Sequence, residues 1–395
     1  MLRSGVFLPC RSHRKIPHNK RLPGDRAFAV RTLSDASIKR CAPPLKAHSA
    51  AVLATARVFI EDDGAPHIAT SSLDGSLAIW RWVEKSVADG AWDLIERLPK
   101  VEGGPVFSLQ TRTTNVGSCQ ESTLLAGLHN KSIVGFKMIR DAPPATRRLP
   151  GTLGGHTGWV RTLAIWDVWA YSAACNYLRV WEWDQAEELP SHVTDLRMFT
   201  GDLLQIRAAE GYVYTTGVDG ALSAWTVNLN HGTLDPLREQ LRAHDGRIEG
   251  LTLAGDVVYT GSFDGSIRAW NARTLEPLAH LEAAHGGERV HTLVSTPTHL
   301  ISGGADGCLR TWKLETMVAD GIVEHAHRAC VRVLNVVGPY TSTVNGPETF
   351  GTTDNIRATS RSYMLISGGD EGDICTWQLQ CLRNDFHAKD PAIKS

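Results

Sequence analysis

Histidines and carboxylates are the residues that could carry chemistry in this chain, and few of them stand in a catalytic pattern. His325 and His327 flank one alanine and could attract a metal ion, but two ligands do not complete a metal site. The chain has no G-x-x-x-x-G-K-[ST] phosphate loop, no H-E-x-x-H zinc motif and no G-x-S-x-G nucleophile turn. The sequence therefore predicts no catalytic residue, no cofactor and no metal site.

Tryptophan, by contrast, recurs in a fixed local pattern. Four seven-residue segments begin with Asp-Gly and end at Trp80, Trp225, Trp270 and Trp312, and three weaker copies end at Phe136, Trp181 and Trp377. In all seven copies an aliphatic residue precedes the aromatic residue by three positions. From Phe136 to Trp312 the aromatic residues are separated by 45, 44, 45 and 42 positions. This spacing is typical of a four-stranded propeller blade.

The repeated unit predicts a tight turn followed by a doubly buried strand. Asp-Gly favours a hairpin turn, because glycine accepts positive φ. A spacing of three puts Leu77 and Trp80 on opposite sides of a strand, so both sides must be covered. Neighbouring blades supply that cover only if the array closes. We therefore expect an all-β fold, a seven-bladed β-propeller.

These repeats resemble the WD-repeat (WD40) family over about residues 38–380. The resemblance implies a hydrogen-bonded tetrad in each blade, formed by a His before the blade, a Ser or Thr on its second strand, the turn Asp and the Trp. The matching residues are His48, Thr70, Asp74 and Trp80 in the first repeat, His244, Thr260, Asp264 and Trp270 in the fifth, and His285, Ser302, Asp306 and Trp312 in the sixth.

The other four repeats depart from this pattern. The third keeps His156, Ser172 and Trp181 but has a shorter turn at Asn176; the fourth has Thr200 in place of His beside Thr215, Asp219 and Trp225; the seventh has Glu371 with His327, Ser367 and Trp377; the second has Gly104, Asn130 and Phe136. Ser or Thr, His and Asp together also make up a hydrolase triad. Because the combination recurs around the ring beside a Trp, we interpret it as structural.

One section supports a finer comparison. Residues 201–314 resemble the propellers of plant-type zinc-finger WD-repeat proteins and of related ubiquitin ligases. Their Cys-x-Cys-x-Cys-x-His finger is absent here, so neither zinc nor RNA binding is expected from the resemblance.

The ends and two internal segments break the period. Residues 1–37 form a basic arm, disordered or a transit peptide, and residues 381–395 form a tail. A strand over about 38–45 is expected to complete the last blade, as the family resemblance implies. Residues 338–362, rich in Thr, Ser, Gly and Asn, predict a long loop inside the seventh blade, and residues 110–122 a shorter polar insertion inside the second.

Charge and cysteine content limit the function classes. Residues 1–46 carry eleven Lys and Arg against two Asp, a balance of +9, so the rest of the chain carries −1 − 9 = −10. An acidic body makes nucleic acid an unlikely ligand class, and no stretch has the ~20 apolar residues of a membrane span. Eight dispersed cysteines indicate reduced thiols. We expect a cytoplasmic or nuclear protein, monomeric within a larger complex, with mitochondrion or plastid as the alternative location.

The rim of the propeller is the remaining candidate surface. The residue after the first apolar position of each innermost strand is expected to face the top or the channel: Leu53, Phe107, Arg161, Gln205, Glu249, His291 and Arg332. Leu73, Val218 and Phe263, just before the turn Asp, are apolar where exposure is expected. We expect Arg161 and Arg332 to be exposed there, beside Phe263 as an apolar anchor.

These residues predict a non-catalytic scaffold that docks a protein or peptide partner, acidic or phosphorylated, on the rim. A substrate receptor of a ubiquitin ligase and an organelle-imported assembly factor are narrower alternatives. A propeller enzyme would have to use Glu249 and His291 on adjacent blades.

Overall fold

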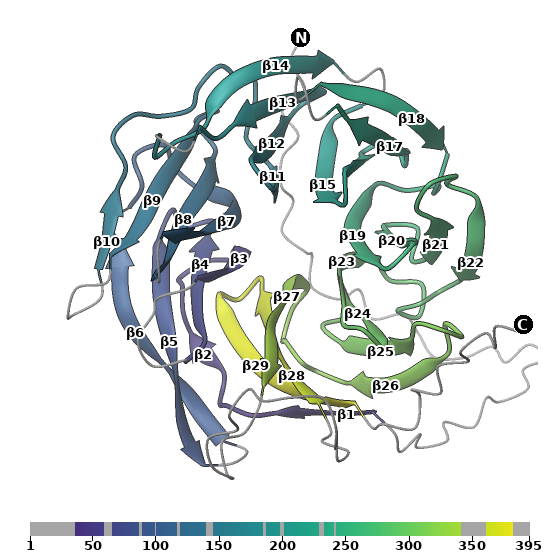
Figure 1. Ribbon diagram of the computed structural model, residues 1–395. Helices are drawn as coiled ribbons and strands as arrows, with labels where there is room; N and C mark the ends of the chain where they lie inside the picture. The colour runs from purple at the N-terminus through teal and green to yellow at the C-terminus, as the bar shows by residue number, and fades with distance from the viewer. Residues whose placement is uncertain are drawn as a thin grey trace, which may run out of the picture.

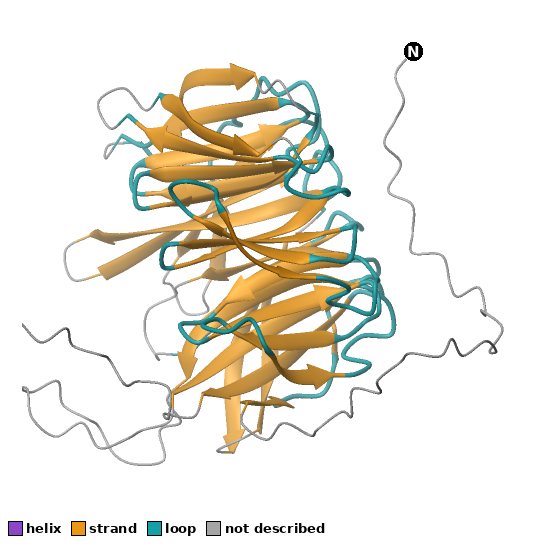
Figure 2. Ribbon diagram, turned by 90° about the vertical axis from the view of Figure 1, so that its right-hand side faces the viewer, coloured by secondary structure: helices purple, strands orange, loops and turns teal. Residues whose placement is uncertain are grey.

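The computed structural model describes residues 36–58, 65–86, 89–98, 100–116, 119–139, 145–184, 187–197, 201–228, 233–240, 242–340 and 361–381. These residues form seven antiparallel sheets arranged in a ring around a central channel (Figure 1). Figure 2 shows the ring from the side, with strands running through its thickness and the described loops at its two faces. The predicted all-β, seven-bladed propeller is confirmed.

Each blade takes its strands in chain order. Blade 1 comprises β3 (Val52–Val58), β4 (His67–Ser72), β5 (Leu77–Ser86) and β6 (Asp89–Leu98), and blade 2 comprises β7 (Val106–Val116), β8 (Cys119–Leu128), β9 (Ile133–Ile139) and β10 (Ala145–Arg148). Blade 3 comprises β11 (Thr162–Trp166), β12 (Trp169–Ala174), β13 (Tyr177–Glu182) and β14 (Ser191–Arg197), and blade 4 comprises β15 (Leu203–Ala209), β16 (Tyr212–Gly217), β17 (Leu222–Val227) and β18 (Leu234–Gln240). Blade 5 comprises β19 (Ile248–Ala254), β20 (Val257–Ser262), β21 (Ile267–Asn271) and β22 (Pro277–Leu281), and blade 6 comprises β23 (Val290–Ser295), β24 (His299–Gly304), β25 (Leu309–Lys313) and β26 (Ala319–Val323). Blade 7 comprises β27 (Val331–Tyr340), β28 (Arg361–Gly369) and β29 (Asp373–Cys381), joined by β1 (Ala36–Arg40) and β2 (Leu45–Lys46).

The hydrophobic core is divided into seven clusters, one between each pair of neighbouring blades. Leu77 packs into the cluster shared by blades 1 and 2, whereas Trp80, on the same strand, packs into the cluster shared by blades 7 and 1. Both side chains are buried. The third strand of a blade is therefore covered on both sides, as the spacing of three predicts.

Two short strands from the start of the chain close the ring. β1 and β2 both pair with β29, and the two prolines at 43 and 44 lie in the break between them, where no ladder hydrogen bond is required of them. The Arg40 guanidinium lies over the Trp377 ring at 4.7 Å from its centroid, and the Trp92 indole donates to Thr376 Oγ1 at 2.7 Å. The predicted clasp strand is confirmed as two pieces, which remove the free edge of blade 7.

Several predicted boundaries are wrong because strands extend into them. Residues 36–37, assigned to the arm, belong to β1, and residue 381, assigned to the tail, ends β29. The loop predicted over 338–362 loses three residues to β27 and two to β28, and residues 341–360 lie outside the described residues, as do 1–35 and 382–395. The polar segment 110–122 is not an inserted loop: most of it extends β7 and β8, which pair from Val106–Leu128 to Val116–Cys119. Polar composition was misleading here, since it did not distinguish an inserted loop from a longer hairpin of the blade.

Candidate functional site

The mouth of the channel is built from irregular strand starts. In six blades the inner strand skips one residue at its beginning, and a bulge of this kind turns a side chain out of the ladder. The skipped residues are Leu53, Phe107, Leu204, Glu249, His291 and Arg332. Arg161 holds the matching position ahead of β11. Five of these match predicted rim residues; in blade 4 the bulged residue is Leu204, which is buried, while the predicted Gln205 lines the channel cavity.

Glu249 and His291 meet at this mouth. The His291 Nδ1 lies 2.8 Å from Glu249 Oε2, and the Arg247 Nε lies 3.2 Å from Glu249 Oε1. Burial alone would raise the pKa of Glu249, but the hydrogen bond and charge of His291 and the charge of Arg247 outweigh burial and hold that pKa below its usual value. Glu249 is therefore an ionised carboxylate that orients an imidazole.

Phe263 lies among cations rather than standing free in solvent. Arg247 and Arg289 approach its ring at 3.8 and 4.8 Å from the centroid, and the His291 ring meets it edge to face at 4.9 Å. Cation–π contacts of this kind hold both guanidiniums beside the ring. Phe263 is half-buried, while Leu73 and Val218 at the same position of other blades are exposed.

Arg332 does not match its predicted exposure. Its side chain is 12% exposed. It donates two hydrogen bonds to Asp370, from Nε to Oδ1 at 2.5 Å and from Nη2 to Oδ2 at 3.2 Å. A fork of this geometry is a strong, specific ion pair. Asp370 lies two residues before the tight turn at 372, far from Arg332 in the sequence. The prediction of exposure was wrong because the pairing of β27 with β28 brings the two residues together.

Four guanidiniums gather at the mouth: Arg161, Arg247, Arg289 and Arg332, called here the mouth arginines. Burial lowers the pKa of Arg247, Glu249 opposes that effect, and the charges of Arg289, Arg332 and Arg161 lower it further. Arg247 and Arg289 were not among the predicted rim residues. Each directly precedes the apolar residue that starts an inner strand, and this recurring position could have identified both from the sequence.

An aromatic patch adjoins the mouth arginines on blades 2 and 3. The Phe107 and Trp159 rings stack with centroids 5.4 Å apart and planes 6° apart, and His129 lies 4.6 Å from Trp159. The Arg161 guanidinium covers Trp159 at 5.3 Å. Trp159, also missed, stands immediately before an inner strand's first apolar residue, as Arg247 and Arg289 do. Cationic and flat apolar surfaces are thus combined on one face.

The residues proposed as tetrads come together away from the mouth opening. In blade 5, His244 Nε2 lies 2.7 Å from Thr260 Oγ1, the Trp270 indole donates to the same oxygen at 2.8 Å, and His244 Nδ1 lies 3.0 Å from Asp264 Oδ2. In blade 6 the corresponding distances among His285, Ser302, Trp312 and Asp306 are 2.8, 3.0 and 2.9 Å.

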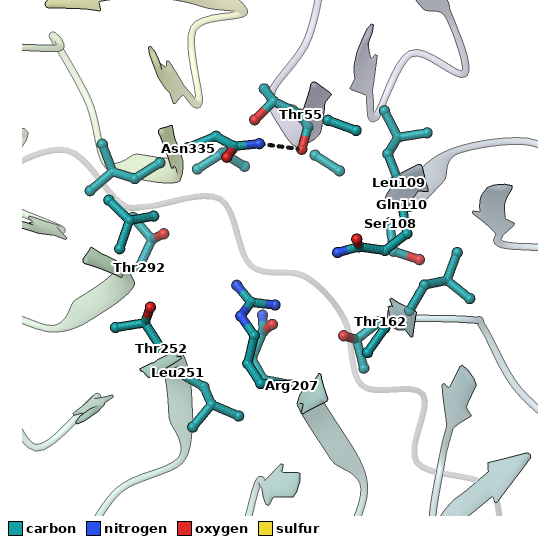
Figure 3. Close-up of a pocket in the computed structure, with 18 of the residues that line it drawn as sticks. Thr55, Ser108, Leu109, Gln110, Thr162, Arg207, Leu251, Thr252, Thr292 and Asn335 are labelled. Atoms are coloured by element: carbon teal, nitrogen blue, oxygen red, sulfur yellow. Dashed lines mark hydrogen bonds between the residues drawn. The ribbon is translucent and has the colours of Figure 1, made fainter. Parts of the chain in front are cut away.

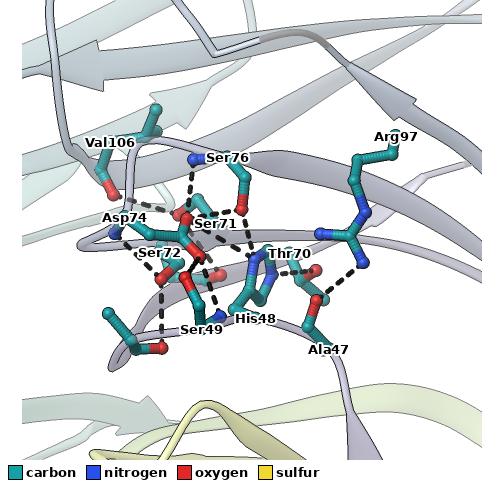
Figure 4. A network of polar contacts seen from close by, with 12 residues as sticks. Ala47, His48, Ser49, Thr70, Ser71, Ser72, Asp74, Ser76, Arg97 and Val106 are labelled. Atoms are coloured by element: carbon teal, nitrogen blue, oxygen red, sulfur yellow. Dashed lines mark hydrogen bonds and ion pairs between the residues drawn. The ribbon is translucent and has the colours of Figure 1, made fainter.

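In blade 1 a serine hydroxyl stands between the histidine and the turn carboxylate (Figure 4). His48 Nε2 lies 2.8 Å from Thr70 Oγ1, which accepts from the Trp80 indole at 2.9 Å. His48 Nδ1 lies 2.6 Å from Ser76 Oγ, and Ser76 donates to Asp74 at 2.5 Å, while His48 and Asp74 are 3.9 Å apart. The turn carboxylate is therefore reached through a serine.

The less complete repeats keep part of this network. His156 and Trp181 both bond Ser172, at 2.7 and 2.8 Å, and His327 joins Ser367 and Glu371 at 2.7 and 2.6 Å. In the fourth repeat, Thr200 lies outside the described residues, while the Trp225 indole donates to Thr215 at 3.2 Å and Asp219 accepts from the backbone of residue 201 at 2.9 Å.

The tetrad histidines have a structural role in the packing of the blades. Burial lowers the pKa of His48 to about 4, although Asp74 opposes this effect, so the ring is neutral near pH 7. The three clearest tetrads have both ring nitrogens occupied, which leaves no free base for catalysis. Across the described part of the chain, no group of three or more His, Cys, Asp or Glu side chains could hold a metal ion. The same residues include no helix long and apolar enough to cross a membrane.

Comparisons with known proteins agree with this architecture. The family described as "WD domain, G-beta repeat" (WD40) matches residues 235–271, from β18 to the end of β21. The WD40 β-propeller domain of Doa1 superposes with a TM-score of 0.61 at 17% identity, covering 87% of this chain and 97% of that one. The computationally designed Ika8 protein superposes with a TM-score of 0.54 at 16% identity, covering 86% and 99%. Identities this low show the fold alone.

The comparison with curated proteins found no match. One recognised repeat, six further blades of the same construction and the likeness to a WD40 propeller domain lead to one conclusion. The chain folds as a seven-bladed β-propeller, and residues 235–271 match the WD40 repeat family.

Proposed function

We propose that this propeller is a non-catalytic scaffold that docks an acidic or phosphorylated segment of a partner protein across the mouth arginines. WD40 propellers are typically protein-interaction scaffolds, so the general class follows from the fold. The specific proposal is carried by one observation: the guanidiniums of Arg247 and Arg289 lie 3.8 and 4.8 Å from the Phe263 ring centroid at the channel mouth, and that of Arg161 lies 5.3 Å from the Trp159 ring.

The cations at the mouth exceed the acids that neutralise them. Glu249 is occupied by His291 and Arg247, and Asp370 by Arg332. Among the described residues, no carboxylate forms an ion pair with Arg161 or Arg289, whose guanidiniums contact only aromatic rings. These two arginines retain their full capacity to bind carboxylate or phosphate oxygens in two-pronged geometry.

The setting favours selectivity for such a segment. Residues 47–395 carry a net charge of −10, so a positive mouth is a local exception on an acidic body. An acidic segment is repelled by most of the surface and attracted at this mouth, which gives both orientation and specificity. Phe263 and the stacked pair of Phe107 and Trp159 add the aromatic surface on which hot spots form.

The narrower roles differ only in the partner. A ubiquitin-ligase receptor and an organelle assembly factor would both use such a docking face. An enzyme would need more than the Glu249–His291 pair, which orients an imidazole but presents no nucleophile beside it among the described residues.

Matched peptides test the proposal directly. A fluorescein-labelled peptide set, each sequence made with serine, glutamate or phosphoserine at the same positions, is titrated against the full chain by fluorescence anisotropy. We expect tighter binding of the glutamate and phosphoserine forms than of their serine counterparts. The double variant Arg161→Glu and Arg289→Glu should weaken that binding at least about a hundredfold, roughly tenfold for each reversed charge.

The control removes the effect of total charge. Arg148→Glu with Arg238→Glu makes the same net change on exposed outer strands and should leave binding unchanged. Arg332 is not used, because reversing it would set a second carboxylate against Asp370 inside the fold. Equal affinity for all three peptide forms, or equal loss in both double variants, would rule out docking at the mouth.

A further inference from the structure

Below the mouth, the channel is lined by a ring of residues whose chemistry differs from that of the rim. Gln110, Arg207, Thr252 and Asn335 lie at one depth, because each pairs with the residue that precedes the tetrad position of its own blade, namely Leu125, Tyr214, Tyr259 and Ile366. The other three blades place Ala56, Ala164 and Val294 at this depth. All seven line a cavity of 560 Å³.

One cation stands in this ring. The Arg207 side chain enters the channel from β15, and the Gln110 side chain enters it from β7 on the far side of Thr162 (Figure 3). The only hydrogen bond described for the Arg207 guanidinium runs from Nη1 to the neighbouring Ile206 carbonyl at 3.2 Å. Among the described residues no carboxylate pairs with it, and burial alone lowers the pKa of Arg207. An arginine remains protonated nonetheless, so the ring holds a positive charge without a counter-charge.

An uncompensated charge away from bulk water is costly to keep. The cavity lining as a whole repeats this imbalance: the described residues that line it include Arg57, Arg161, Arg207 and Arg332 against the single carboxylate of Glu249. That carboxylate is bound by His291 and Arg247 at the mouth and is not available to Arg207. Nothing within the described chain therefore compensates Arg207.

The remaining ring members suit an anion rather than an apolar ligand. Amides at Gln110 and Asn335 can donate N–H groups, whereas the Thr252 hydroxyl already donates to Ser295 Oγ at 3.2 Å, because Ser295 donates its own proton to the Leu253 carbonyl. The Asn335 amide already donates to the Thr55 carbonyl at 3.0 Å, and one further N–H on the same nitrogen remains. A cavity of 560 Å³ holds a tetrahedral oxyanion with water to spare, since one water takes up ~30 Å³ of liquid.

We propose that the channel ring is a binding site for a phosphate-like oxyanion, held by the Arg207 guanidinium and the amide donors of Gln110 and Asn335. The site is separate from the docking face, because its residues lie further along the inner strands than the bulges that form the mouth. The anion has two sources of identical chemistry, free phosphate and the phosphoryl group of a segment docked above.

Thermal unfolding of the full chain in sodium phosphate and in sodium chloride, at equal pH and ionic strength, tests the site. Phosphate also stabilises proteins generally by exclusion from their surface, so the informative quantity is the difference between variants. The wild type should gain at least about 2 °C more from phosphate than Arg207→Met does once phosphate exceeds its Kd tenfold. In chloride, Arg207→Met should melt at the same temperature as the wild type or higher, because it removes a half-buried charge that has no counter-charge among the described residues.

A second measurement does not depend on melting. Broadening of the ³¹P resonance of inorganic phosphate should occur with the wild type, persist in Arg207→Lys and vanish in Arg207→Met. The double variant Arg161→Met and Arg289→Met keeps the ring and should still broaden the signal. Loss of broadening in that double variant, with Arg207→Met unchanged, would overturn the ring site and place anion binding at the mouth instead.

Equal gains from phosphate in the wild type and Arg207→Met would likewise overturn the proposal, as would a lower melting temperature of Arg207→Met in chloride. The source of the anion is decided by adding a phosphoserine peptide to the ³¹P sample. Displacement of phosphate shows that a docked segment reaches the ring, and undiminished broadening shows that the free anion occupies it.

Discussion

Blade 5 and blade 2 have the same four-strand plan but hold it together differently. Blade 5 joins His244, Thr260 and Trp270 by hydrogen bonds. Blade 2 has Ala126 at the hydroxyl position and Phe136 at the tryptophan position, both buried, so that layer is apolar. The polar chain is therefore dispensable for blade geometry, which the inter-blade clusters and sheet ladders maintain.

The turns of the two blades converge despite different residues. Asp264 Oδ1 accepts from the Ser266 backbone at 2.9 Å and its hydroxyl at 2.7 Å, and Asn130 Oδ1 accepts from Ser132 in the same way at 3.2 and 2.6 Å. An acceptor followed two residues later by serine closes the turn in either blade. The four predictions below test this comparison, from the largest expected effect to the smallest.

Opening the ring should unfold all blades, whatever polar contacts each of them contains. Removing residues 1–46 deletes β1 and β2 and exposes the β29 edge, so we expect no cooperative unfolding transition by circular dichroism. Removing residues 1–33 leaves both strands and should leave the melting temperature unchanged. Two truncations with equal melting temperatures would show that closure does not depend on the clasp.

Removing the aromatic residue should cost both blades about the same. Trp270→Ala and Phe136→Ala should each lower the free energy of unfolding by about 3–5 kcal/mol, since both side chains are at most 4% exposed. Urea titration gives these values. Trp270→Phe separates packing from polarity: it should cost about 1 kcal/mol through the lost bond to Thr260. A loss below about 1 kcal/mol for Trp270→Ala would contradict its place between blades.

Blade 3 is intermediate in its polar contacts, because it has the histidine but no turn carboxylate. The pH dependence of stability therefore measures the free energy lost when this buried histidine has to be protonated. Burial lowers the pKa of His156 to about 4, helped by Arg179 and opposed by Asp195, while the unfolded value is about 6.5. The unfolded state takes up the proton first, so stability is full above pH 7 and is lost as the pH falls from 6.5 towards 4.

Between pH 7 and pH 5 the wild type should therefore lose about 2 kcal/mol more than His156→Gln, which does not titrate. Urea titration at the two pH values measures this difference. His327, whose pKa is raised to about 9 by Cys375 and Glu371 against the effect of burial, titrates in both proteins and cancels. Parallel losses in wild type and variant would mean that His156 is not held neutral.

The turn of blade 2 contains a correctable strain. Lys131 has φ 76°, where five other blades have glycine with φ between 72° and 84°. Lys131→Gly should raise the free energy of unfolding by about 0.5–1 kcal/mol, because relief of the left-handed conformation exceeds the entropy cost of glycine. Chemical denaturation detects a change of this size; Gly265→Lys in blade 5 should be destabilising. A neutral or negative effect of Lys131→Gly would show that the two turns are not equivalent.

Local patterns were enough to predict much of this molecule. The period of the aromatic residues, the turn signals and the spacing of Leu77 and Trp80 depend only on hairpin geometry and strand alternation, so blade number and buried faces followed from the sequence. The approximate clasp and the residues of the three clearest tetrads were implied by the resemblance to the WD-repeat family, and each tetrad residue was placed by its offset within the repeat.

The contacts between blades and across the channel were decided only by the tertiary structure. The pairing of Arg332 with Asp370, the gathering of the mouth arginines and the isolation of Arg207 all join residues whose distance depends on bulge positions and ring closure. A bulge shifts a side chain by one register step without leaving a mark on the sequence, as at Leu204. The positions of charged side chains across the channel depend on six such bulges together, and no local pattern encodes them.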